Sequence, residues 1–399
     1  MGSDDRTIQV KVGHVRVVLA FVVGCILTAT ALHFMKKKSD SDDWSFDDDE
    51  NEFHMYQLPP TSKEEEERIK EVYTKGATCD KTEQHPKGCA YSTLITKDDF
   101  IECALVLAES MRAAGSSYPL VALVTPKVSI RGLEMLQKAG ITVESIPELQ
   151  TPPTASPHRE NWRDTFNKLS LFGKTEYERL VYIDADSLVL SSLDSLFQRP
   201  GEFLSATDRH LCQHKSTPGM SSMISVIWPS RETEKQLLDM FNKSQSLFVR
   251  GDQSLTENVF LTPPHSLTLL PPSVSSFVFR CQCDDYYTEG WEEEGMHGLP
   301  NQEKIPKSIH FTHWFRPHVS ANGVTIPLGL SDPAKQCAEH IYKRWEEMWR
   351  AAFERQGLTQ EQMLQEMIRP HPETKEEKEE RREREVLEEE RERERKRKR

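Results

Sequence analysis

Apolar and polar residues alternate in two different rhythms between residues 90 and 146, and each rhythm indicates one kind of element. Short continuous apolar runs are typical of buried strands, whereas apolar residues three and four apart indicate helices. The runs follow the order strand, helix, strand, helix, strand, at 90–96, 98–115, 119–125, 129–140 and 141–146. Gly115 and Gly140 end the two helical runs, where glycine is a common stop signal. This alternation predicts βαβ units and a mostly parallel sheet flanked by helices.

The same texture continues after a proline-rich loop at 147–157. A helix is expected to lead from this loop into a strand at 179–184, which ends in an acidic pair. Two further strand-like runs and two helical runs follow, at 202–208, 222–229, 231–243 and 338–356. We therefore expect one α/β domain over residues 88–357.

An uncharged apolar run precedes this domain at 17–35. As a helix it would span roughly 28 Å, about the thickness of one hydrocarbon core. Lysines follow it at 36–38, as is common at the ends of membrane spans. We predict a single-pass type II anchor after a short tail at 1–16, with the C-terminal bulk in the secretory lumen. The alternatives are a cleaved signal peptide, since residues 29–31 resemble a cleavage site, and a buried soluble helix.

Charge is spread unevenly along the chain. The net charge of the 399 residues is -13, and residues 39–67 alone hold twelve acids and one lysine, or -11. The remainder is nearly neutral and has no evident basic face, which argues against nucleic-acid binding. The acidic stretch lacks an apolar period, so residues 36–87 are predicted to form a stem. Its helical part is expected to begin at Thr61 or Ser62, where Glu65 would complete a capping box.

The C-terminal segment, 358–399, is also charged, but it is balanced. Residues 373–399 hold twelve Glu and twelve Lys or Arg. This composition is typical of a solvated single helix with i,i+4 ion pairs, or of a disordered tail. We expect it to carry no catalytic group.

The chain has eight cysteines, which is consistent with an oxidising lumen, but their pairing does not follow from the sequence. Cys25 lies in the apolar run, and Cys103 is expected to be a buried thiol. The pairs considered are Cys79 with Cys89, and Cys281 or Cys283 with Cys212 or Cys337. Asn242-Lys243-Ser244 is a glycosylation sequon if the domain is luminal.

Two carboxylates, Asp184 and Asp186, stand one residue apart at the end of the apolar run 179–184. Side chains alternate along a strand, so the two share a face while the chain stays extended. In open α/β sheets ligands bind beyond the carboxyl ends of the strands. Two carboxylates there repel each other, and a divalent cation relieves the repulsion. Oxygen ligands suit Mg²⁺ or Mn²⁺, which also bind phosphate oxygens, so this pair predicts half of a metal–diphosphate site.

The run from Asn167 to Phe197, which contains the acidic pair, resembles the core of the glycogenin-like family 8 glycosyltransferases. The opening runs A-Y-S-T-L-I-T-K-D-D-F and A-L-V-L-A-E-S-M-R resemble it too, and the resemblance covers roughly residues 88 to 320. It implies the GT-A nucleotide-diphospho-sugar transferase fold. It also implies a UDP-sugar donor, a Mn²⁺ ion or another divalent cation such as Mg²⁺, and a reaction that retains the anomeric configuration.

The resemblance extends to the metal and diphosphate ligands. Asp184 and Asp186 match the family's D-x-D, and His310 matches the metal-binding histidine of the pattern H-x-x-G-x-x-K-P-W. Arg316 stands where that pattern has a lysine for the diphosphate, and arginine can also clamp phosphate. The positions that depart from the pattern are His313 and His318.

The nucleotide and phosphate contacts are implied in the same way. Leu94, Thr96 and Phe100 match the nucleotide-binding start of the first strand and helix. Arg159 and Lys168 match basic residues that approach the donor sugar and phosphates, and on sequence alone each could equally be a surface cation.

The sugar pocket of the family is matched at two places. Asp252-Gln253 corresponds to its D-Q pair, for which an N-terminal helix cap at Asp252 is the structural alternative. Ser221 and Ser222, followed by Met223, stand where the family has N-S-G. Because this change falls where the donor sugar is selected, the sugar is left open.

These observations predict a metal-dependent retaining glycosyltransferase in a secretory membrane, with the Golgi favoured by the short anchor and stem. The acceptor is a glycan, a lipid or a protein. One alternative is a phosphatase of the haloacid dehalogenase type, although about 95 residues of α/β pattern precede the acidic pair. The other is a non-catalytic membrane scaffold, although a scaffold has no use for a charge cluster in a cleft.

Overall fold

The computed structural model describes residues 60–150, 160–208, 219–243, 250–271, 273–278, 306–312, 317–320, 323–325, 332–359 and 361–362. The chain divides into two compact units, Met1–Met55 and Tyr56–Arg399, and every described residue belongs to the second. The predicted anchor at 17–35 and the charged tail beyond 362 lie outside the described residues. Within those residues, no helix has both the length and the apolar character needed to cross a membrane.

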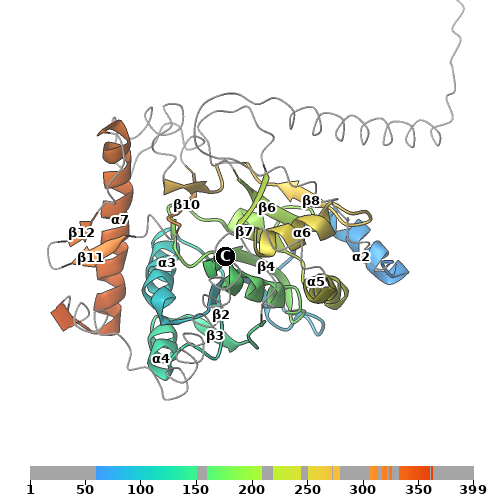
Figure 1. The fold of residues 1–399 in the computed structure, drawn as a ribbon, viewed down its shortest axis with the longest axis horizontal. Helices are drawn as coiled ribbons and strands as arrows, with labels where there is room; N and C mark the ends of the chain where they lie inside the picture. The colour runs from blue at the N-terminus through green and yellow to red at the C-terminus, as the bar shows by residue number, and fades with distance from the viewer. Residues whose placement is uncertain are drawn as a thin grey trace, which may run out of the picture. The chain divides into compact units, whose positions relative to one another are not determined.

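A seven-stranded sheet forms the centre of the described unit (Figure 1). Its strand order is β3-β2-β1-β4-β7-β6-β8, and all neighbours are parallel except β7, which runs antiparallel to both β4 and β6. The strands are β1 Gly88–Ile95, β2 Leu120–Val124, β3 Thr142–Ser145, β4 Tyr177–Ile183, β6 Phe203–Asp208, β7 Gly219–Ile227 and β8 Leu267–Leu269. The predicted α/β class with a mostly parallel sheet is confirmed.

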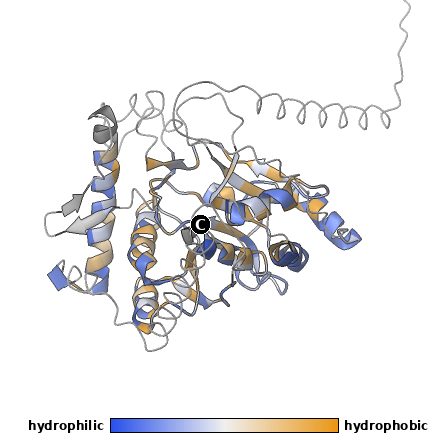
Figure 2. Cartoon of the chain, viewed as in Figure 1, coloured by the Kyte–Doolittle hydropathy of each residue, from blue (hydrophilic) through white to orange (hydrophobic). Residues whose placement is uncertain are grey.

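Alternate residues of each strand pack against different helix layers, as the two-residue period of a strand requires. On β1, Tyr91 and Ile95 pack with α3 (Ile101–Ala113) and α4 (Ile130–Lys138). Ala90 and Leu94 face the opposite layer, which consists of the 3₁₀ helix η2 (Glu160–Leu171), α5 (Arg231–Lys243) and α6 (Asp252–Phe260). In Figure 2, α3 is mostly orange, because most of its residues are hydrophobic, and ten of its thirteen residues are buried, while the visible face of α5 is blue.

A second, three-stranded sheet joins distant parts of the chain beside the first. Its order is β5-β10-β9, with β5 Ser187–Val189, β10 Ser308–His310 and β9 Ser276–Phe277. The remaining short elements are η1 Asp98–Phe100, η3 Asp194–Leu196 and the hairpin β11 His318–Ser320 with β12 Gly323–Thr325. The small sheet matters for function because β5 directly follows Asp186 and β10 ends in His310.

The closing helix α7 spans Asp332–Gln356, six residues longer at its start than the pattern predicts. Its buried residues Trp345 and Trp349 pack against Val106 of α3, and the same cluster contains Phe311, the neighbour of His310. The indole N–H of Trp349 also donates a hydrogen bond to the carboxylate of Glu102. This helix therefore covers α3 and supports the small sheet.

Part of the predicted stem packs on the domain. Helix α2 (Lys63–Val72) begins where expected, and its cap Ser62 accepts a hydrogen bond from the backbone N–H of Glu65. The side chain of Glu65 does not complete the capping box. It accepts bonds from Ser230 and other residues of the domain, while Glu232 accepts from the backbone N–H of Ser62.

One of the disulfides considered from the sequence forms, between Cys79 and Cys89. Cys103 is buried in α3, as predicted. Cys212, Cys281 and Cys283 lie outside the described residues, and the structure describes only the backbone of Cys337. The other candidate pairs therefore stay predictions.

Candidate active site

The acidic pair lies where β4 leaves the large sheet and β5 begins the small one. The backbone N–H of Asp184 donates to the carbonyl of Met223 on β7 at 2.9 Å, which holds the chain extended beyond the last residue of β4. The carbonyl of Asp186 accepts from the backbone N–H of Phe311 at 3.0 Å. Both acids are thus fixed by their backbones at the carboxyl end of β4, the edge where ligands bind in such sheets.

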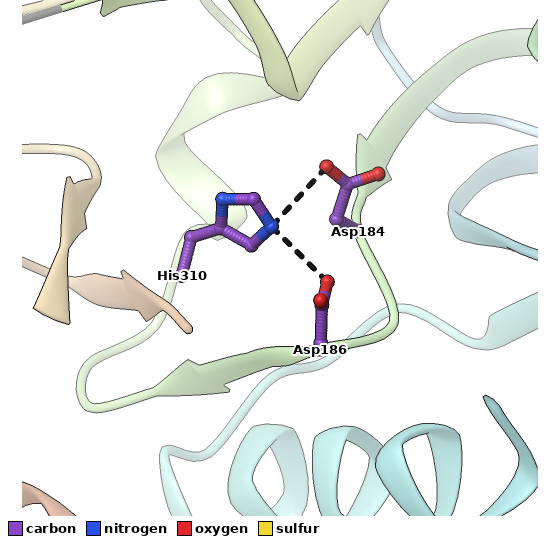
Figure 3. A group of neighbouring side chains, drawn as sticks. All are labelled: Asp184, Asp186 and His310. Atoms are coloured by element: carbon purple, nitrogen blue, oxygen red, sulfur yellow. Dashed lines mark hydrogen bonds and ion pairs between the residues drawn. The ribbon is translucent and has the colours of Figure 1, made fainter. Parts of the chain in front are cut away.

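His310 lies beside the two acids, although it is 124 residues from Asp186 in the sequence. We call the place where Asp184, Asp186 and His310 meet the metal corner. Strand β10 pairs antiparallel with β5, which places His310 opposite Ser187, next to the acids. Its Nε2 atom lies 3.1 Å from Oδ1 of Asp186 and 3.5 Å from Oδ2 of Asp184 (Figure 3). The three side chains are only 10–19% exposed. The predicted triad is therefore assembled in space.

The corner favours a positive charge between the two acids. Burial alone would lower the pKa of His310, but the Asp186 and Asp184 carboxylates outweigh burial and raise it above its usual value. Among the described residues, the other ring nitrogen of His310, Nδ1, is buried without a hydrogen-bond partner. The electrostatics of the imidazole are therefore set by the two carboxylates.

These residues fit a divalent cation. One ligand atom from each of Asp184, Asp186 and His310 lies within 4.8 Å of the others, so a single ion could reach all three. Carboxylate oxygens and an imidazole nitrogen are suitable donors for Mn²⁺ or Mg²⁺. The cation would also relieve the repulsion between the buried acids, which is the cost that this arrangement otherwise carries.

Lys168 connects the metal corner to the predicted sugar pocket. Its Nζ atom, delivered by η2, lies 2.9 Å from Oδ1 of Asp184 and 3.9 Å from Oδ2 of Asp252, and it donates to Oγ of Ser222 at 3.1 Å. Burial alone would lower the pKa of Lys168, but the two carboxylates raise it, so the side chain stays charged. The buried ammonium thus links acids from two separate elements.

Asp252 and Gln253 begin α6 beside this lysine. The cap position is occupied by Gly251, so Asp252 is not the helix cap that the structural alternative required. Asp252 is 4% exposed, and burial raises its pKa despite the opposing charge of Lys168. Gln253 Nε2 donates to the carbonyl of Met220 at 2.6 Å, which fixes its side chain against β7.

Two groups that sequence analysis did not single out belong to this cluster. The hydroxyl of Tyr182, two residues before Asp184, donates to Oδ1 of Asp184 at 2.6 Å. Burial and the Asp184 carboxylate raise the pKa of Tyr182 well above its usual value, so the phenol stays protonated. Thr165 Oγ1 accepts from the backbone N–H of Asp252 at 3.3 Å. The period of β4 places Tyr182 on the same face as Asp184, because residues two apart share a face, but it does not reveal the contact with Lys168.

The remaining predicted residues are placed less closely or not at all. Leu94 and Thr96 lie at the carboxyl end of β1, the strand beside β4, and both are buried; Phe100 is the last residue of η1 and the N-cap of α3. Ser221 is buried on β7, but the side chain that contacts Lys168 is that of Ser222. The predicted phosphate-binding residues Arg159 and Arg316 lie outside the described residues, as does His313.

Curated relatives of the chain are glycosyltransferases. It is 30% identical over 232 residues to inositol phosphorylceramide glucuronosyltransferase 1 of Arabidopsis thaliana, covering 56% of this chain and 41% of the relative. It is 34% identical over 178 residues to glycogenin-1 of Oryctolagus cuniculus, covering 43% and 50%. It is 30% identical to UDP-glucuronate:xylan alpha-glucuronosyltransferase 1 of Arabidopsis thaliana, covering 44% and 25%. The resemblance to the glycogenin-like family is thereby confirmed, and the chain spans half or less of these relatives.

No protein-family model matches the chain. Among solved structures, it is similar to the glycosyltransferase GlyE of Streptococcus pneumoniae, with a TM-score of 0.41 and 15% identity over 67% of this chain and 63% of that one. A mutant of LgtC matches with a TM-score of 0.43 and 12% identity, over 63% and 95%.

Proposed function

We propose that this chain, a homologue of glycogenin and of the xylan glucuronosyltransferases, is a metal-dependent retaining glycosyltransferase that uses a UDP-sugar donor. The observation that carries the proposal is the partly buried triad of Asp184, Asp186 and His310, with Lys168 paired to Asp184 at its edge. Three ligands on one cation and an ammonium beside them form a site for a diphosphate.

The triad would hold the cation, with Asp184, Asp186 and His310 as its protein ligands. When bound, a divalent ion neutralises negative charge that develops on the leaving diphosphate, which is a large catalytic effect in a water-excluded site. The residues of the chain need little rearrangement for this role, because their backbones are held by β7 and β10.

Lys168 and Asp252 would act on the donor side of the reaction. Lys168 adds fixed positive charge within 2.9 Å of a triad carboxylate, so it stabilises a diphosphate bound at the same corner. Asp252 lies 3.9 Å from that ammonium, where it orients sugar hydroxyls or stabilises positive charge at the anomeric carbon. Gln253, the next residue of α6, is held against β7 by its bond to Met220 and would lie beside Asp252 on the sugar side. The oxygen of the acceptor hydroxyl would bond to the anomeric carbon, with retention of configuration, as the bond from that carbon to the diphosphate oxygen breaks. UDP is the leaving group, and its diphosphate oxygen would take the hydroxyl proton.

The setting we propose is a secretory membrane, the Golgi in particular, with a single-pass type II anchor at 17–35 and a luminal catalytic domain. The disulfide between Cys79 and Cys89 supports an oxidising compartment. UDP-glucuronate is one donor to test, because two of the relatives are named glucuronosyltransferases. Glycan, lipid and protein acceptors remain open.

The test is release of UDP by the purified full chain. UDP-glucose, UDP-galactose, UDP-N-acetylglucosamine and UDP-glucuronate are supplied in turn, each with Mn²⁺ and with a chelator. We expect Mn²⁺-dependent release from one donor, lowered about 100-fold or more in Asp186→Ala because charge stabilisation worth several kcal/mol is lost. Asp239→Ala, which removes an acid from the surface of α5, is the matched control and should retain activity.

A different outcome would redirect the assignment. If Asp186→Ala released UDP as fast as the wild type, the triad would not be the catalytic centre. If the protein bound neither Mn²⁺ nor any UDP-sugar, the non-catalytic scaffold would replace the transferase.

A further inference from the structure

Tyr182 lies at the metal corner, although its side chain is not a metal ligand in the arrangement described above. It is the penultimate residue of β4 and shares a face with Asp184, because residues two apart on an extended chain point the same way. The residue is 2% exposed, and its hydroxyl donates to Oδ1 of Asp184 at 2.6 Å. A tyrosine in this position can therefore fix the rotation of the carboxylate.

The ring of Tyr182 also supports the second group that holds this carboxylate. Nζ of Lys168 lies 4.8 Å from the centre of the ring and 2.9 Å from the same Oδ1 atom. A cation over an aromatic face is stabilised by the ring, more strongly where water is excluded. Tyr182 thus contacts Asp184 through its hydroxyl and Lys168 through its ring.

As a result, the two oxygens of the Asp184 carboxylate have different partners. Oδ1 accepts from Tyr182 and pairs with Lys168, whereas Oδ2 faces His310 Nε2 at 3.5 Å. A half turn of the carboxylate merely exchanges two equivalent oxygens, whereas any intermediate rotation would take the acceptor away from the Tyr182 hydroxyl and leave a buried phenol without a partner. The tyrosine therefore directs one oxygen to the side of the corner that His310 and Asp186 share.

We propose that Tyr182 is a positioning residue that orients Asp184 for the divalent cation, so that Oδ2 alone serves as the ligand. The inference rests on the proposed function, because it presumes a cation held by the triad. Groups that hold metal ligands in place typically change metal affinity 10–100-fold when they are removed. Tyr182 is not a catalytic residue, since it acts only through Asp184 and Lys168.

The experiment is a Mn²⁺ titration of the full chain, followed by the electron paramagnetic resonance signal of the free ion. The variant is Tyr182→Phe, which removes the hydroxyl and keeps the ring under Lys168. The matched control is Tyr91→Phe on the neighbouring strand β1. The hydroxyl of Tyr91 donates to Oδ1 of Asp194 at 2.6 Å, the same bond at the same length, but it packs on the opposite face of the sheet.

We expect Tyr182→Phe to bind Mn²⁺ about 10–100-fold more weakly than the wild type, and Tyr91→Phe to bind it equally well. Thermal unfolding of both variants reports the loss of stability that any buried hydrogen bond would cause. In an Asp184→Asn background, removal of the Tyr182 hydroxyl should weaken binding no further, because both changes act on the same ligand. If Tyr182→Phe does not fold, Tyr182→Met fills similar space without a hydroxyl and serves in its place.

Wild-type affinity in Tyr182→Phe, or an equal loss in Tyr91→Phe, would overturn the proposal while leaving the triad intact. Binding of Mn²⁺ that survives Asp186→Ala, or no binding by the wild type, would instead overturn the proposed metal site, and this inference with it. Since Asp186→Ala does not touch Tyr182, the two failures are distinguishable.

Discussion

Gly251 is the residue on which the position of Asp252 depends most directly. Its φ is +61°, and a Cβ atom there would lie 2.5 Å from Oγ1 of Thr165, the atom that accepts from the backbone of Asp252. Gly251→Ala should therefore lower stability twice over. The backbone at Gly251, with ψ −140°, lies in a region nearly restricted to glycine and costs another residue about 1–3 kcal/mol, and the overlap adds about 1–3 kcal/mol. Because relief of the overlap must move Thr165 or Asp252, donor turnover should also fall.

Gly115→Ala is the control that separates the cost of the backbone conformation from the cost of the steric overlap. Its φ is +74°, but no heavy atom lies within 4 Å of the added Cβ. Chemical unfolding of both variants should show only the conformational cost of about 1–2 kcal/mol for Gly115→Ala, with turnover unchanged. Equal losses at the two glycines would contradict the proposed contact between Gly251 and Thr165.

For physical reasons, some residues of the site could be predicted from the sequence and others could not. Asp184 and Asp186 were predictable because two acids at the end of an apolar run make little sense without a cation. Tyr182 was not, because a tyrosine in a buried strand is indistinguishable from core until Lys168 is seen over its ring. Its contact with the lysine depends on how η2 packs on the sheet, which no local pattern encodes.

At the scale of elements, helix α2 of the predicted stem is expected to stabilise the domain. Glu65 accepts bonds from Arg68, Ser230 and Thr233 and is 6% exposed, so it attaches the helix to the domain. Glu65→Ala would remove the acceptor of the buried hydroxyls of Ser230 and Thr233 and should destabilise the protein by about 1–3 kcal/mol, as measured by chemical unfolding. Glu71→Ala, on the exposed face of the same helix, is the control. Equal stability of Glu65→Ala and wild type would show that the hydrogen bonds of Glu65 do not stabilise the attachment of α2.

The hydrophobic pattern of the sequence could not predict the strands of the small sheet. The longer strands and helices up to β7 were predictable because each is long enough to show its period, but β5, with three residues, was not. Strands β9 and β10 have two and three residues, too few for any period, and they pair only with one another and with distant β5. His310 was therefore found through family resemblance, and its strand through the structure.

For the molecule as a whole, an ion cluster across three strands predicts the response to acid. Glu144 on β3 pairs with Lys174 and with Lys87, which precedes β1, and accepts from Tyr177 of β4. Burial alone would raise the pKa of Glu144, but these partners lower it from 4.5 to about 2. Since the folded pKa is depressed, its stabilisation is fully present above about pH 4.5 and is lost as the pH falls toward about 2.

The depressed pKa of Glu144 should be visible in the pH dependence of the unfolding free energy. Unfolding free energy of the wild type should fall between about pH 4.5 and 2, and Glu144→Gln should flatten that part of the profile while lowering stability at pH 7. Glu176→Gln, which removes only one partner of Lys87, should leave most of the slope in place. If Glu144→Gln kept the full wild-type slope, the acid response would belong to other carboxylates. The outer strand β3 would then be held to the sheet by its pairing with β2, without a measurable contribution from the contacts of Glu144 with Lys87, Lys174 and Tyr177.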